Sequence, residues 1–144
     1  MALTNYAENK IVDAVLRGQA LGAPATLYIA LFTAAPTDTG GGTEVTGGSY
    51  ARVAVTASLA NFSGTQATAS TTASSGTGGQ SSNNAAITFP APTANWGSIT
   101  HVMIMDASSS GNGWLHGALT TPKTVNSGDA APSFAIAELV VTFG

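Results

Sequence analysis

Short runs of β-forming residues, separated by turn residues, follow one another along most of this chain after Gly18. Each run is bounded by Gly, Pro, Ser or Asn, and no helical periodicity lies between the runs. The spacing therefore predicts a mainly β fold, an antiparallel β-sandwich or jelly roll, as one domain over residues 1–144. The predicted strands cover residues 26–33, 50–59, 85–89, 98–106, 114–119 and 133–143.

One amphipathic helix is predicted before these strands, over residues 5–17. Thr4 is a good N-cap, apolar residues recur at three- and four-residue spacing, and Gly18 provides a C-terminal stop. The helix carries several of the few charges in the chain, which can steer docking onto a partner. We therefore expect an interface that includes Glu8, Lys10, Asp13 and Arg17.

Two further regions stand out. Arg52 is an isolated charge in the alternating strand 50–59, so we expect it to pair with a carboxylate, Glu44 or Asp106, at or near a subunit contact.

Residues 63–84 form an uncharged tract of mainly Ser, Thr, Gly, Ala and Asn, which alone cannot bury enough apolar surface to order its backbone. The tract predicts a flexible polar loop or a long polar hairpin that is available for contacts.

The low charge of the chain indicates an assembly subunit. Only 8% of the residues are charged, whereas an ordinary domain has about 25%. A surface wetted mainly by Thr, Ser, Asn and Gly favours a protein whose surface becomes covered. We expect its partners to include further copies of itself, as a dimer or trimer.

Other partners are disfavoured by the sequence. The four cations are scattered, so no basic cluster is present for nucleic acid. No apolar run approaches the length needed to span a membrane, and the start lacks a secretory signal, so we expect synthesis in a cytoplasm.

The residues that carry chemistry are sparse, which argues against an enzyme and against a bound cofactor. There is no cysteine, no nucleophile elbow and no phosphate-binding glycine motif. His101 and His116, with Asp106 as a third ligand, could form a metal site, but both fall in predicted strands and are better interpreted as sheet residues. Trp96 and Trp114 could stack on a glycan, although core or interface packing is the more usual role of such residues.

Several motifs resemble a family of small tailed-bacteriophage virion proteins over nearly the whole chain. They are residues 22–33 (GAPATLYIALFT) followed by Pro36, 47–52 (GGSYAR), 87–90 (ITFP), 96–101 (WGSITH) and 117–119 (GAL). Members of the family are described as tail-fibre-like or head-associated structural proteins. The resemblance implies a structural role and transfers no catalytic residue.

Two places in the virion are compatible with the resemblance. The size, the β-rich pattern and the missing charge favour a capsid decoration (cement) protein on the capsid exterior, with the major capsid protein as a partner. The alternative is a tail-fibre or tail-tip protein involved in host adsorption, although the chain has neither heptads nor repeats. In both cases the protein would be made in the bacterial host cytoplasm.

Overall fold

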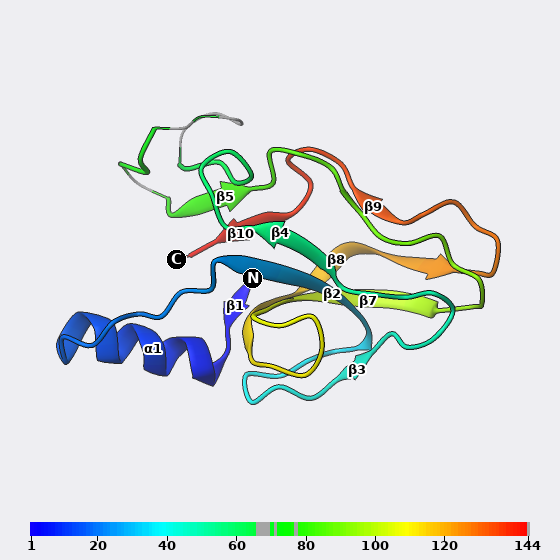
Figure 1. The fold of residues 1–144 in the computed structure, drawn as a ribbon, viewed down its shortest axis with the longest axis horizontal. Coiled ribbons are helices and arrows are strands. Elements are labelled where there is room, and N and C mark those ends of the chain that lie inside the picture. Colours follow the sequence, from blue (N-terminus) through cyan, green and yellow to red (C-terminus); the bar gives the residue numbers. More distant parts are fainter. Residues whose placement is uncertain (66–69, 71, 77, 144) are drawn as a thin grey trace.

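The centre of the molecule is one antiparallel sheet. The computed structural model describes residues 1–65, 70, 72–76 and 78–143. Within them the strand order of the sheet is β1-β8-β7-β2-β3, and β4 also pairs with β2 (Figure 1). The strands of this sheet are β1 (Ala2–Leu3), β2 (Thr26–Ala34), β3 (Thr43–Glu44), β4 (Val53–Thr56), β7 (Gly97–Met105) and β8 (Gly113–Val125).

Two short antiparallel sheets and one helix complete the described fold. β5 (Gln80–Ser82) pairs with β10 (Val140–Thr142), and β6 (Ile87–Thr88) pairs with β9 (Ser133–Phe134). The helix α1 (Asn5–Leu16) lies at the N-terminal end (Figure 1). The predicted mainly β, antiparallel fold with a single N-terminal helix is thus confirmed for the residues that the structure describes.

The two faces of the central sheet carry two separate apolar clusters. Because side chains alternate along a strand, Ile29 and Leu31 of β2 point to one face and Ala30 and Phe32 to the other. The first face, with Ile104 of β7, packs against the short sheets and forms the main core. The opposite face carries the small cluster of Ala30, Phe32, Met103 and Met105, with Tyr28 packed against it.

Several strand ends differ from the sequence prediction. β8 continues past Pro122 to Val125, where β7 is its only partner in the described sheet and the missing N–H of proline costs no ladder bond. Residues 133–143 form two short strands instead of one, because Ala137 has a φ of 64° inside an intervening turn. The predicted strand 50–59 contracts to β4, and β3 lies in residues 36–48, where no strand was predicted.

The described part of the Ser/Thr-rich tract 63–84 is tied to the fold at both ends. Ser63 and Ser82 are hydrogen-bonded to each other, and Phe62 forms an antiparallel bridge with Asn83. Asn83 is only 1% exposed; its Nδ2 donates to the carbonyls of Ala85 (2.8 Å) and Ala135 (2.7 Å), and its Oδ1 accepts from the Leu139 N–H. The last part of the predicted loop is therefore a strand and a buried polar link, whereas positions 66–69, 71 and 77 lie outside the described residues.

Helix α1 begins and ends close to the predicted residues. The Thr4 hydroxyl accepts from the Ala7 N–H at 3.2 Å as an N-cap, and Arg17 is the C-cap. The Thr4 hydroxyl also donates to the carbonyl of Gly113, and β1 pairs with β8 just before the helix starts. These contacts fix the first turn of α1 to the sheet, while the rest of the helix projects beyond the sheet (Figure 1).

Candidate functional site

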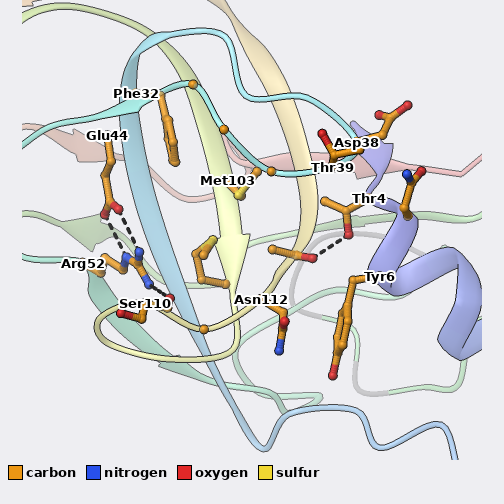
Figure 2. A pocket seen from close by; sticks show the side chains of 17 residues that line it. Thr4, Tyr6, Phe32, Asp38, Thr39, Glu44, Arg52, Met103, Ser110 and Asn112 are labelled. Carbon is orange, nitrogen blue, oxygen red and sulfur yellow. Dashed lines mark hydrogen bonds and ion pairs between the residues drawn. The ribbon is translucent and has the colours of Figure 1, made fainter.

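A pocket of about 460 Å³ lies over the sheet face that is opposite the main core (Figure 2). Its floor is made by Phe32 of β2 and by Met103 and Met105 of β7. Its walls come from the loop between β2 and β3, the loop between β7 and β8, and the start of α1. Arg52 and Glu44 lie at one end, and Tyr6 lies at the other (Figure 2).

Arg52 forms the most connected polar group of this pocket. Its Nε and Nη2 donate to the two carboxylate oxygens of Glu44, both at 2.8 Å, and its Nη1 donates to the carbonyls of Ala107 and Ser110. The Arg52 side chain is 7% exposed. The Glu44 hydrogen bond raises the pKa of Arg52, although burial acts against it. Arg52 thus pairs within its own chain, with one of the two expected carboxylates, and holds the 106–112 loop.

Tyr50 connects the ion pair of Arg52 and Glu44 to the core of the protein. Its hydroxyl donates to Oε1 of Glu44 at 3.0 Å and accepts from the Leu31 N–H at 2.9 Å. Its ring packs edge-on against Trp96, with ring centroids 5.3 Å apart. Burial is the main cause that raises the pKa of Tyr50 far above its ordinary value of 10.0.

The raised pKa of Tyr50 predicts a loss of stability in alkali. Above about pH 10 the unfolded chain releases the phenol proton while the folded chain retains it, so the free energy of unfolding falls as pH rises. Below that pH the contribution is fully present. Urea unfolding at a series of pH values, with near-ultraviolet absorbance to follow phenolate formation, measures this. If one tyrosine does not stay protonated until the protein unfolds, the prediction is wrong.

Asp106, the other expected partner of Arg52, shapes the neighbouring loop instead. Its carboxylate accepts from the backbone N–H of Asn112 at 2.7 Å and from the Asn112 side chain at 2.9 Å. Burial raises its pKa, but the bonds from Asn112 outweigh this effect, so the pKa of Asp106 is lowered. A Cβ at Gly111 would come within 2.5 Å of the carboxylate, so this tight turn requires glycine.

His101 lies in β7 and His116 lies in β8, so both histidines are sheet residues, as predicted. His116 Nε2 lies 3.0 Å from Oδ1 of Asp38 at the pocket rim, and His101 Nδ1 lies 2.8 Å from the hydroxyl of Thr100. Among the residues that the structure describes, no group of three metal-ligating side chains comes together. No described helix is long and apolar enough to cross a membrane.

A comparison with known protein families identifies the family of this chain. A family model described as "Podophage GP4 fiber I protein gp80" matches residues 2–142. The chain belongs to this family. No curated protein matches the chain. The prediction of a tailed-phage virion structural protein is confirmed, and the description of the Gp80 family supports the fibre alternative better than capsid decoration.

Membership of the Gp80 family also relates to the prediction that the protein is not an enzyme. A structural fibre family is consistent with the prediction of a non-enzymatic protein. In the pocket, the charged groups of Arg52 and Glu44 are already engaged with each other. Through its bonds to the carbonyls of Ala107 and Ser110, Arg52 holds the 106–112 loop beside the pocket.

The structure places the two tryptophans differently from an exposed interface pair. Trp96 is 6% exposed, and its indole N–H donates to the carbonyl of Gly48 at 2.9 Å, so it belongs to the core of this Gp80 protein. The expectation of an interface role does not fit that position. Trp114 is half-buried and packs edge-on against Tyr6 at 5.6 Å, where it anchors the first turn of α1. Neither tryptophan offers a free aromatic platform for a glycan.

The charges expected at an interface lie along α1, but they are not its main surface feature. Asp13 and Arg17 pair with each other at 2.8 Å, Lys10 lies 5.7 Å from the centre of the Tyr6 ring, and Glu8 is exposed. An amphipathic helix usually packs its apolar side against the rest of the protein, whereas four apolar residues of α1 are exposed: Ile11 (37%), Val12 (46%), Val15 (73%) and Leu16 (76%). At about 1.5 to 3 kcal/mol for each fully buried side chain, this exposure forgoes on the order of 5 kcal/mol.

Proposed function

We propose that this chain is a non-enzymatic structural subunit of a podophage tail fibre and takes part in host adsorption. The observation that carries the proposal is the match of a fibre family to nearly the whole chain. Two features support it. The surface is poor in charge, which suits a protein that is covered by neighbours, and the ion pair of Arg52 is engaged in holding loops.

Location in the virion tests the proposal. Antibodies against the purified protein, used for immunogold labelling of intact virions, are expected to label fibres at the tail and to leave the capsid faces unlabelled. An antibody against the major capsid protein serves as the matched control. Label spread over the capsid shell would overturn the fibre proposal.

Removal of the protein gives a second, independent readout. Virions that lack it are expected to adsorb to host cells far more slowly, while their capsids retain DNA on heating as well as the parent capsids do. A decoration protein would give the reverse pattern, since it stabilises the shell by binding only the assembled form. Capsids that lose DNA at lower temperature while adsorption is unchanged would establish capsid decoration instead.

A further inference from the structure

Asn112 and Gly113 form the one Asn–Gly pair of the sequence, and they lie where the 106–112 loop joins β8. The side-chain amide of an asparagine can be attacked by the backbone nitrogen of the next residue, and glycine, which lacks a Cβ, hinders this attack least. Asn112 is exposed at the wall of the pocket. The pair is therefore in reach of water, and it is the sequence position in this chain where an asparagine is least protected by its neighbour.

Both residues of this pair have a structural role. A Cβ at Gly113 would come within 2.6 Å of Sδ of Met103. Met103 forms part of the pocket floor and is 2% exposed, so its side chain has little room to move away. Asn112 supplies two donors to the carboxylate of Asp106, its backbone N–H at 2.7 Å and its side-chain Nδ2 at 2.9 Å. The packing of β7 on β8 and the turn of the loop thus bring the two residues together in sequence.

Asp106 restrains the Asn112 amide. Attack on the amide requires its carbon, Cγ, to move toward the backbone nitrogen of Gly113. The same carboxylate holds both the backbone and the side chain of Asn112, so this movement costs hydrogen bonds. The loop is also fixed from the other side, because Arg52 donates to the carbonyls of Ala107 and Ser110. The rate of attack therefore depends on how firmly Asp106 holds Asn112.

We propose that Asn112 is a modification site, that it loses its side-chain amide at a rate that Asp106 restrains, and that the loss releases the 106–112 loop. The nitrogen of Gly113 attacks Cγ of Asn112, the bond from Cγ to Nδ2 breaks, and ammonia leaves with the proton of the Gly113 N–H. A five-membered imide ring results. Water then opens the ring at one of its two carbonyls and gives aspartate or isoaspartate. No electrons are transferred, and water is the only co-reactant.

The product places a second carboxylate beside Asp106. Where Nδ2 of Asn112 donates at 2.9 Å, the product has an acceptor oxygen, and two carboxylates that share a site repel each other. Isoaspartate also adds a methylene group to the main chain at the start of β8. Both changes remove the bonds that shape the loop, and with it a wall of the pocket. The inference does not depend on where in the virion the chain lies.

Storage of the purified full chain at mildly alkaline pH tests the site, with peptide mapping by mass spectrometry and an isoaspartate assay as readouts. Asn112 is expected to convert before the other asparagines. Asp106→Ala removes both bonds and is expected to speed the conversion about 10-fold. Asp129→Ala is the matched control, because Asp129 accepts from the backbone N–H of Asn126 at 2.8 Å in a turn elsewhere, and it should leave the rate at Asn112 unchanged.

Two results would overturn the proposal: Asn112 stays intact while another asparagine converts, or the rate is the same in the parent and in Asp106→Ala. Circular dichroism checks that each variant is folded. Asp106→Asn keeps an acceptor oxygen for the Asn112 backbone N–H, and its rate should lie between those of the parent and Asp106→Ala. This second variant keeps the test decisive if Asp106→Ala does not fold.

Asn112→Asp reproduces one product directly and tests the consequence for the loop. Hydrogen exchange of the backbone amides in the 106–112 loop is expected to become about 10-fold faster. Asn9→Asp adds the same charge at an exposed position of α1 and should leave that exchange unchanged. Equal exchange of the loop in the parent and in Asn112→Asp would show that the modification does not release the loop.

Discussion

Replacing Arg52 by Ala is expected to lower the free energy of unfolding by about 3 to 5 kcal/mol, because it leaves the partly buried Glu44 carboxylate without its main partner. The carbonyls of Ala107 and Ser110 and the hydroxyl of Tyr50 also lose part of their network. The change in the midpoint of urea unfolding at neutral pH, converted with the denaturant slope, measures the effect.

A second ion pair of the same chain provides the control. Asp13 and Arg17 are at the same distance, 2.8 Å, but their side chains are 37% and 70% exposed. Arg17→Ala should therefore cost no more than about 0.5 kcal/mol. A double variant of Glu44 and Arg52 should cost less than the sum of the two single changes, because removing both partners leaves no unpaired charge. Equal effects of Arg52→Ala and Arg17→Ala would refute the structural role of Arg52.

Asn83→Ala is expected to lower the free energy of unfolding by a similar amount, about 3 to 5 kcal/mol. The change leaves the buried N–H of Leu139 without its acceptor, at about 1 to 3 kcal/mol, and removes the bonds to the carbonyls of Ala85 and Ala135, at about 0.5 to 1.5 kcal/mol each. The Ala135 carbonyl keeps its bond from the Glu138 N–H. Thermal unfolding followed by circular dichroism should show a large fall in the midpoint.

An exposed asparagine separates this effect from a general sensitivity to the substitution. Asn9→Ala, on the exposed side of α1, should change stability by less than about 0.5 kcal/mol. Loss of the link that Asn83 makes should also loosen the pairing of β5 with β10, which hydrogen exchange detects as faster exchange of the backbone amides that join these two strands. Unchanged exchange there, with an unchanged midpoint, would show that the link is dispensable.

The parts of the fold that could be predicted from sequence are those that local patterns determine. The apolar runs of β2 and β7 and the capped helix α1 are of this kind. β1, β3 and β5 were not predicted, because strands of two or three residues exist only through pairing with distant segments. The burial of Asn83 was also not predictable, since a polar residue in a Ser-rich tract gives no signal of burial.

The site was partly predictable for the same reason. The isolation of Arg52 pointed to a carboxylate partner, and Glu44 was one of two candidates. The exposure of Ile11, Val12, Val15 and Leu16 could not be predicted, because helical periodicity identifies an apolar strip but not whether the rest of the chain covers it. Trp96 looked equally suited to core or surface until Gly48 and Tyr50 were placed beside it.

The attachment of α1 to the sheet has a consequence for the order in which the protein matures during synthesis. β1 pairs with Leu115 and His116, and the Thr4 hydroxyl bonds to Gly113. At about 5 to 20 residues per second, the ribosome needs roughly 5 to 20 s to add the intervening chain. The segment that contains β1 and Thr4 therefore waits for the later-made β8, and helix α1 stays without its anchor on the nascent chain during that time.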